Sequence, residues 1–293
     1  MIHNLITVVT PCFNLNRDQD NLIQLAIQLK EFSFCSILVI TDPHISPAVF
    51  KQLRSLFDEV LVSPGATAGK ARNIGMGLVK TDFVWFIDSD DEVVSSHLPD
   101  LTKYLENRLG DLIICEHFRI DNDNNDKCSK ERINSNLSLL ENLHRDIGIW
   151  RMIFSISFIR KKDIRFVEGF GEDLIFVVNC SQHNPVIRYF PFPIYSYHVS
   201  PDSATYNQNY LSSIVKSLIE FDVLLEKGLE ENSRPLKLLH ARMLTSAFLR
   251  SNWKNKKSIA LYLLKSPRFL YRWMETLIYF ARIKLAHKIQ GLK

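Results

Sequence analysis

Short apolar runs alternate with stretches of helical periodicity over the first ninety residues. Runs typical of buried strands occupy residues 5–10, 36–41, 58–63 and 82–88. Between them, apolar residues recur at helical spacing in residues 20–31, 46–57 and 68–80. Strands that alternate with helices predict an α/β fold in which a mostly parallel sheet is flanked by helices on both faces.

Prolines mark the boundaries of two of these elements. Pro11 is expected to stop the first strand and to open a turn. Ser46 and Pro47 are expected to begin the second helix, as its N-cap and its first helical residue.

The second half of the chain is less regular. Strand-like or extended patterns occupy residues 111–120, 150–161 and 186–200. A helix is predicted over 171–182, and the polar residues 121–136 predict a loop. From about residue 209 onward the pattern is helical, and no internal repeat is present.

Polar clusters follow three of the predicted strands, at residues 11–14, at Asp42 and at residues 88–91. Because ligands bind at the carboxyl ends of the strands in such sheets, these clusters are expected to converge there. The densest cluster contains Asp88, Asp90, Asp91 and Glu92. In an extended segment, Asp88 and Asp90 point to the same side, where two carboxylates together with a diphosphate suit Mg²⁺ or Mn²⁺. The alternative is a turn with helix caps, since Ser95 or Ser96 can begin a helix.

The composition is that of a globular protein with a substantial core. Of 293 residues, 46% are hydrophobic and 23% charged, which excludes a disordered chain. The five cysteines include no CxxC pair, so we expect neither a disulfide framework nor a zinc site, and a reducing cytosol fits best. The N-terminus lacks a signal-peptide pattern, and no window of about 18 apolar residues predicts a spanning helix.

The charge is distributed unevenly. Residues 250–293 carry eleven Lys and Arg residues and one acid, Glu275, although the whole chain has a formal net charge of only +4. Interleaved with aromatic and aliphatic residues, this composition predicts an amphipathic helix on an anionic membrane surface. The alternative is a helical cap on the rest of the chain. Nucleic acid binding is not expected, because no recognition motif accompanies the charge.

Three segments, in order, resemble the family 2 glycosyltransferases of the GT-A fold. "VVTPCFN" is similar to that family's first strand and turn, and "AGKARNIGMGLVKTDFVWFIDSDDE" to its Ala-Arg-Asn helix and Asp-x-Asp strand. "FVEGFGEDLIF" is similar to its acceptor-side Glu-Asp segment. The resemblance spans about residues 5–205. It implies a GT-A-like catalytic domain over residues 1–205, with a donor half (1–95) and an acceptor half (96–205), and leaves 206–293 as a basic helical C-terminal extension.

The resemblance implies a role for each matching residue. The donor nucleotide sugar is expected to lie against Pro11, Phe13, Asn14, Asp42, Arg72, Asn73, Asp88 and Ser89. Asp90 and Asp91 are expected at the metal, with His198 as a further candidate, and Asp173 as the catalytic base. Glu172 and Trp150 are expected on the acceptor side. The family's usual Asp-Gly-Ser is replaced by Asp42-Pro43-His44 here, and His198 stands where an Arg is commoner.

Six of these residues also have a purely structural interpretation. Asp42 can cap a turn, Phe13 can belong to the core, and Arg72 can pair with a nearby acid. Glu172 and Asp173 suit the first turn of a helix through the helix dipole alone, and His198 can be a packed histidine. Their occurrence together in the family's order favours the functional interpretation.

The resulting prediction is an inverting, metal-dependent glycosyltransferase that uses Mn²⁺ or Mg²⁺. It moves a hexose or N-acetylhexosamine from a nucleotide sugar, expected to be a UDP-sugar, to a saccharide or lipid-linked saccharide. The resemblance and the basic segment place it in bacterial surface polysaccharide or lipopolysaccharide synthesis, at the cytoplasmic face of the cell membrane. The rivals are a nucleotidyltransferase, which would need a glycine-rich phosphate loop absent from "TPCFNLNRDQD", and a non-catalytic membrane scaffold.

Overall fold

The computed structural model describes residues 5–107, 110–121, 148–169, 171–199 and 233–265, together with 218, 221, 270, 271, 274 and 278. The chain forms two compact units. Unit 1 comprises Met1–Leu139 and Ile147–Pro201, and unit 2 comprises Leu140–Asp146 and Asp202–Lys293. The predicted loop over 121–136 lies outside the described residues, apart from Asp121.

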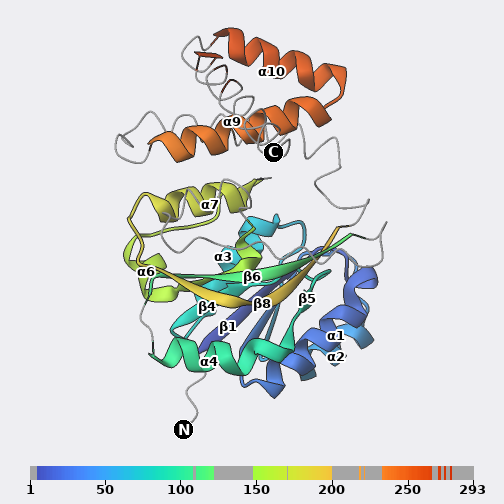
Figure 1. The fold of residues 1–293 in the computed structure, drawn as a ribbon. Coiled ribbons are helices and arrows are strands. Elements are labelled where there is room, and N and C mark those ends of the chain that lie inside the picture. The colour runs from blue at the N-terminus through green and yellow to red at the C-terminus, as the bar shows by residue number, and fades with distance from the viewer. Residues whose placement is uncertain are drawn as a thin grey trace. The chain divides into compact units, whose positions relative to one another are not determined.

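Unit 1 is built on one eight-stranded sheet with the order β3-β2-β1-β4-β7-β6-β8-β5 (Figure 1). The parallel half contains β1 (Ile6–Cys12), β2 (Cys35–Ile40), β3 (Glu59–Val62) and β4 (Phe83–Phe86). The other half contains β6 (Leu112–Asp121), β7 (Met152–Ser155), β8 (Ile187–Val199) and the two-residue β5 (Glu92–Val93). β7 is antiparallel to β4 and β6, and β5 is antiparallel to β8. The mostly parallel α/β sheet predicted from the sequence is confirmed.

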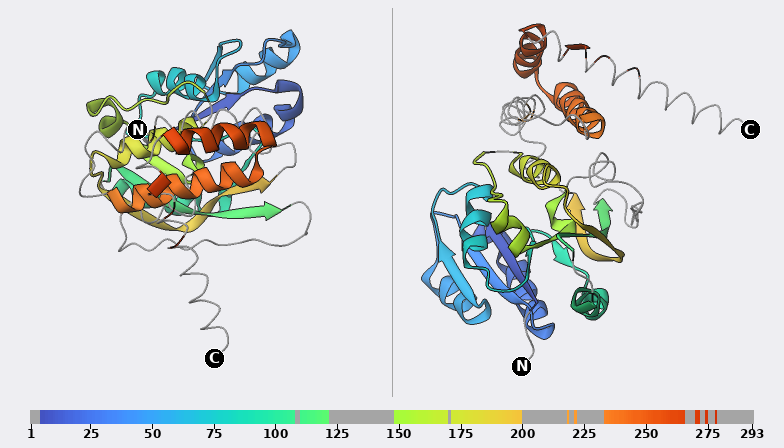
Figure 2. Two further views of the ribbon diagram at one scale, coloured as in Figure 1. Left: turned by 90° about the horizontal axis from the view of Figure 1, so that it is seen from above. Right: turned by 90° about the vertical axis from the view of Figure 1, so that its left-hand side faces the viewer.

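Helices cover both faces of this sheet (Figures 1 and 2). The elements concerned are α1 (Leu15–Glu31), α2 (Pro47–Leu56), α3 (Ala68–Leu78), α4 (Leu98–Asn107), α6 (Ile156–Lys161) and α7 (Glu172–Ser181). On one face, Leu29 of α1 and Leu101 of α4 pack in one core cluster with Trp85 of β4. On the other face, Phe86 of β4 contacts Phe176 of α7. Alternate residues of β4 thus face opposite layers, as the two-residue repeat of a strand requires.

Two boundaries differ from the sequence prediction. β1 continues through Pro11 to Cys12, although Pro11 was expected to end it. The carbonyl of Val9 accepts from the N–H of Ile87 on the β4 side, and the N–H missing from Pro11 would point to that same side, beyond the end of β4. No ladder hydrogen bond is therefore lost. α1 starts at Leu15 rather than near residue 20, because the Asn14 side chain caps it by accepting from the N–H of Arg17.

The prediction of a single strand over 150–161 was wrong. A 3₁₀ turn (Ile149–Arg151) is followed by β7 and then by helix α6. The Ser155 side chain ends the strand and begins the helix by accepting from the N–H of Phe158. When apolar residues cover every side of a segment, the sequence shows no periodicity that distinguishes a strand from a helix.

In unit 2, the described residues form α9 (Ser233–Arg250) and α10 (Trp253–Lys265), which lie side by side (Figure 2). The helical pattern predicted for this region is confirmed over these two spans. Asn252 caps α10, since its side chain accepts from the N–H of Asn255 at 3.0 Å. Among the described residues, no helix is both long enough and apolar enough to cross a bilayer.

Candidate active site

The carboxyl ends of β1 and β2 meet, as their polar residues predicted. Asn14 follows β1, and Asp42 follows β2. The Asp42 carboxylate accepts from the N–H of Leu15 at 3.0 Å and from that of His44 at 2.8 Å. The hydrogen bonds from His44 and Leu15 lower the pKa of Asp42, so it stays ionised. Asp42 therefore ties the turn after β2 to the start of α1.

Residues 88–92, which we call the acidic loop, follow β4 and contact α1. Arg17 of α1 forms ion pairs with Asp18 at 2.5 Å and with Asp90 at 3.1 Å. The Ser89 hydroxyl donates to the Asp18 carboxylate at 2.7 Å. Burial and then the charge of Asp88 raise the pKa of Asp90, while Arg17 opposes the shift. The carboxylate of Asp90 is thus the exposed member of a crowded negative group.

The acidic loop is also held by β8, through Asp91. The Asp91 carboxylate accepts from the Tyr195 hydroxyl at 2.5 Å and from the N–H of His198 at 3.0 Å. Burial and repulsion by Asp88 raise the pKa of Asp91 to about 8. Both oxygens of Asp91 are therefore engaged inside the protein, and its main visible role is to hold the loop.

Arg72, in the first half of α3, joins the acidic loop to the start of α7. Its two terminal nitrogens bind Asp88 at 2.6 Å and Glu172 at 2.7 Å, and its guanidinium lies 5.6 Å from the centre of the Phe166 ring. Burial alone would lower the pKa of Arg72, but the charges of Asp88 and Glu172 outweigh it and the net shift is upward. Two carboxylates that are 84 residues apart in the sequence thus share one buried cation.

Asp173 lies next to this bridge, in the first turn of α7. Burial and repulsion by Glu172 raise its pKa to about 7, and Arg72 acts in the opposite direction. Its carboxylate accepts from the N–H of Leu174 at 2.8 Å, and the side chain remains partly exposed. A carboxylate with a pKa near neutrality is suited to accept a proton.

The close packing of α3 on α7 depends on Gly69. A Cβ atom at this position would lie 2.4 Å from the carbonyl oxygen of Val167 and 3.0 Å from a side-chain carbon of Glu172. Gly171, just before α7, has φ of 80°, which favours glycine. These glycines allow the Glu172–Asp173 pair to approach α3 closely enough for Arg72 to reach it.

Residues 7–167 match the description "Glycosyl transferase family 2", a span that covers more than half of the 293 residues. The chain belongs to glycosyl transferase family 2. This membership confirms the family that the order of the motifs predicted.

Individual relatives are distant in sequence. The uncharacterized glycosyltransferase EpsJ of Bacillus subtilis (strain 168) is 20% identical over 217 residues, which is 69% of this chain and 63%, or less than two thirds, of EpsJ. S. aureus TarS 1-349, in complex with UDP-GlcNAc, has a TM-score of 0.64 at 15% identity, covering 91% of this chain and 79% of that one. The chain spans only 44% of a longer TarS structure.

Another solved structure has a similar fold. The mannosyltransferase PcManGT from Pyrobaculum calidifontis, in complex with GDP-Man and Mn²⁺, has a TM-score of 0.55 at 12% identity, covering 97% of this chain and 87% of that one. At these identities the structural likeness shows the fold alone. The GT-A-type fold predicted from the sequence is confirmed.

Some predicted site residues of this family 2 member have structural partners that account for their positions. The Asn73 side chain binds the backbone of Phe166 twice, at 2.8 and 3.0 Å. Trp150 is buried and stacks on Tyr195, with ring centres 4.7 Å apart. Phe13, in contrast, is 74% exposed beside the start of α1, so it is not a core residue. The roles assigned to these residues, and to Pro11, remain predictions.

The sequence analysis missed Arg17, Asp18 and Tyr195. Asp18 is almost fully buried and binds both Arg17 and Ser89. It gave no signal in the sequence, because acidic residues are common in the first turn of a helix. Tyr195 contacts Asp91 across 104 residues of sequence. The extended pattern over 186–200 and the candidate His198 drew attention to this segment, but nothing local in it identifies the tyrosine that reaches the acidic loop.

A divalent metal, which the family resemblance implies, fits best at Asp90. No group of three or more metal-binding side chains gathers anywhere in the described ranges. The carboxylate of Asp90 is half exposed, and its pKa is raised first by burial and then by the charge of Asp88, an environment that a cation relieves. Mg²⁺ and Mn²⁺ are often held by one or two carboxylates plus substrate phosphates, so a full protein cage is not required. The ring of His198 is turned toward Glu92, with its Nε2 atom at 3.5 Å.

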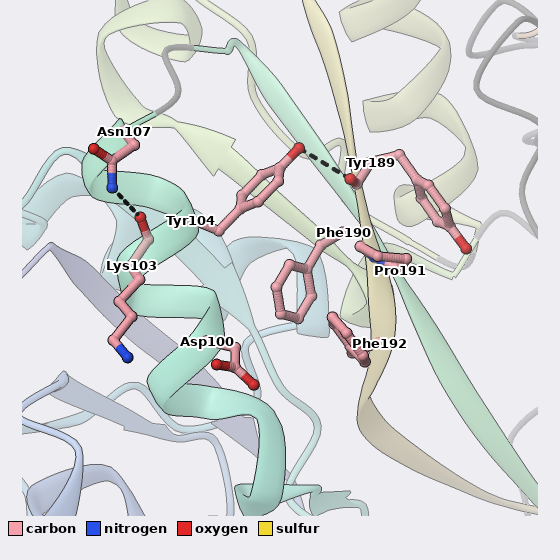
Figure 3. A pocket seen from close by; sticks show the side chains of 8 residues that line it. All are labelled: Asp100, Lys103, Tyr104, Asn107, Tyr189, Phe190, Pro191 and Phe192. Carbon is pink, nitrogen blue, oxygen red and sulfur yellow. Dashed lines mark hydrogen bonds between the residues drawn. The ribbon is translucent and has the colours of Figure 1, made fainter.

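A separate pocket of about 600 Å³ lies between α4 and the first half of β8 (Figure 3). Its aromatic wall includes Tyr104, whose hydroxyl donates to the carbonyl of Tyr189, and the ring of Phe192. His198, which contacts the acidic loop, lies at the opposite end of β8. The pocket is therefore distinct from the candidate active site.

Proposed function

We propose that the chain is an inverting, metal-dependent glycosyltransferase that uses a nucleotide sugar, specifically a UDP-sugar. It transfers a hexose or N-acetylhexosamine to a saccharide or lipid-linked saccharide in bacterial surface polysaccharide or lipopolysaccharide synthesis. The structure of TarS with UDP-GlcNAc supports the choice of donor, and that of PcManGT with GDP-Man and Mn²⁺ supports a divalent metal. The excess of basic residues in 250–293 supports a place at the inner face of the cell membrane.

The bridge made by Arg72 is the observation that carries this proposal. It sets the acidic loop, which would face the donor diphosphate, beside Asp173, the carboxylate whose pKa is about 7. A transfer reaction needs both a site for a departing anion and a base for an incoming alcohol. The candidates for these two roles lie on either side of one guanidinium.

The proposed reaction is a single displacement. The acceptor hydroxyl attacks the anomeric carbon from the face opposite the diphosphate, and the new C–O bond forms as the old one breaks. The electron pair of the broken bond leaves with the nucleoside diphosphate. Asp173 takes the hydroxyl proton, a general-base role worth about 10²–10⁴-fold, and one such displacement inverts the anomeric centre.

The other residues position the reactants. Asn14, Asp42 and Phe13 border the donor side, Asp88 is the candidate partner of the ribose, and Asp90 is the candidate ligand of the metal. A bound divalent cation would neutralise the developing charge of the diphosphate as a Lewis acid. Asp91 supports Asp90 by anchoring the loop to Tyr195 and His198.

Release of nucleoside diphosphate from a panel of nucleotide sugars, with Mn²⁺ and with EDTA, tests the proposal. We expect one UDP-sugar to be consumed only with metal, and Asp90→Ala to abolish metal-dependent donor binding in a thermal-shift assay. Asp20→Ala, which changes an exposed acid of α1 outside the described contacts of the acidic loop, is the control. Donor binding by Asp90→Ala that still responds to Mn²⁺ would refute the metal assignment.

The non-catalytic scaffold is the second candidate, because the large share of residues with structural roles is compatible with it. It predicts no turnover of any nucleotide sugar in either condition. The nucleotidyltransferase alternative is disfavoured by membership of the glycosyltransferase family.

A further inference from the structure

Helix α10 of unit 2 is apolar on two opposite sides. Ile259 and Leu263, one turn apart, are buried. Trp253, Leu261 and Leu264 lie on the other side and are 81%, 48% and 69% exposed. At about 100° per residue, positions 253, 261 and 264 fall within one quarter of the helix circumference, away from 259 and 263. Packing within the protein explains only the buried side.

The exposed apolar side chains are accompanied by positive charge. Lys254 and Lys257 are exposed on the same side of α10, and the helix contains no acidic residue. Leu249, near the end of α9, is also exposed. A surface on which tryptophan and leucine stand among lysines is energetically unfavourable in water and favourable at a lipid headgroup boundary.

We propose that this face of α10, formed by Trp253, Lys254, Lys257, Leu261 and Leu264, docks on the headgroup region of an anionic bilayer. The apolar side chains enter the boundary with the acyl chains, and the lysines remain among the lipid phosphates. The proposed function places the protein at a membrane, and this inference assigns the surface that makes the contact. It concerns unit 2 alone and does not depend on the transfer chemistry.

Charge complementarity selects this partner over two others. A second copy of the chain would bring lysine against lysine, which is unfavourable. Single-stranded nucleic acid would use the lysines and the tryptophan, but it has no use for two exposed leucines. The remaining basic residues of 250–293 add attraction of the same sign, at about a fivefold gain in partitioning for each lysine near the surface.

Co-sedimentation of the full chain with lipid vesicles tests the inference. We expect binding to vesicles of phosphatidylcholine mixed with phosphatidylglycerol and little binding to phosphatidylcholine alone. Trp253→Ser is expected to weaken the binding about tenfold or more. Lys254→Gln with Lys257→Gln is expected to weaken it about 25-fold, following the value for each lysine.

Matched controls come from unit 1. Ile27→Ser removes an apolar side chain that is 48% exposed, as Leu261 is, and Lys51→Gln with Lys103→Gln removes two exposed lysines. Both are expected to bind vesicles like the wild type. Wild-type chain that ignores anionic vesicles, or Trp253→Ser that binds them fully, would overturn the inference. If Trp253→Ser instead converts a dimer to a monomer in light scattering, without loss of vesicle binding, the face joins two copies.

Hydrolysis of the donor without vesicles separates this inference from the proposed function. Trp253→Ser is expected to retain hydrolysis while losing vesicle binding. Vesicle binding by a chain without hydrolytic activity would refute the enzyme proposal and leave the docking surface intact.

Discussion

The two acidic clusters of unit 1 differ in how their carboxylates are satisfied. In the acidic loop, Asp88, Asp90 and Asp91 each have a side-chain partner in Arg72, Arg17 or Tyr195. At the start of α7, Glu172 is paired with Arg72, whereas the hydrogen bond that Asp173 accepts within the described part of the chain comes from the N–H of the residue that follows it. The acids of the loop are suited to hold the loop in one conformation. The one at α7 is suited to exchange a proton.

Removal of the proton acceptor is expected to have the largest effect. Asp173→Asn keeps the shape of the side chain but cannot accept a proton, so transfer falls about 10²–10⁴-fold. Donor binding, followed by thermal shift, is expected to remain. Asp163→Asn is the control, since the described contact of the Asp163 side chain is an exposed ion pair with Arg165. Unchanged turnover in Asp173→Asn would overturn the assignment of the base.

Arg72 connects the clusters, so its replacement tests whether they act together. Arg72→Lys cannot reach both carboxylates with separate nitrogens, and the misplacement is expected to lower the transfer rate about 10²-fold. Arg72→Gln also removes the charge that lowers the pKa of Asp173. Because the base works when deprotonated, the acid limb of the pH–rate profile is expected to move to higher pH in Arg72→Gln. An acid limb that stays in place would show that Arg72 has no electrostatic influence on Asp173.

The contact of α3 with α7 can be loosened without a change of charge. The methyl group of Gly69→Ala would overlap the carbonyl of Val167 and press on Glu172, at a cost of about 1–3 kcal/mol. Gly77→Ala, in the same helix, meets nothing within 4 Å and is expected to stabilise the chain by about 0.5–1 kcal/mol. Urea unfolding measures both. Equal stability of the two variants would contradict the close approach.

In the acidic loop the expected effect is on stability alone, and it appears only as pH changes. With a pKa of about 8, Asp91 keeps its proton in the folded chain at pH values where the unfolded chain has lost it. The free energy of unfolding therefore falls as pH rises from about 4 to about 8. Asp91→Asn removes this contribution, so we expect Tm to fall less over that range in the variant than in the wild type. Parallel pH profiles for the two proteins would refute the raised pKa.

The sequence was most informative where local pattern determines structure. Apolar runs and helical spacing predicted the parallel strands, and the polar residues after them predicted where the site would form. Pro11 inside β1 and the start of α6 at Ile156 were not predictable, because each depends on which neighbour lies alongside. The hydrogen bond from Tyr195 to Asp91 depends on the pairing of β8 with β5, which no local signal in the sequence predicts.

The sequence predicted that the motif residues would lie near the site, but it did not predict which contact each of them makes. Arg72 and Asn73 adjoin in the sequence, yet one bridges two acids and the other clamps the backbone of Phe166. Successive residues of a helix point about 100° apart, so adjacent letters of one motif serve different neighbours.

The guanidinium shared by Asp88 and Glu172 has a consequence for how such chains diverge. Loss of either acid leaves the buried charge of Arg72 only half neutralised. Loss of Arg72 leaves Asp88 and Glu172 without the cation that they share. Positions 72, 88 and 172 should consequently vary as a trio among descendants of this sequence, and a lone exchange at any of them should be rare.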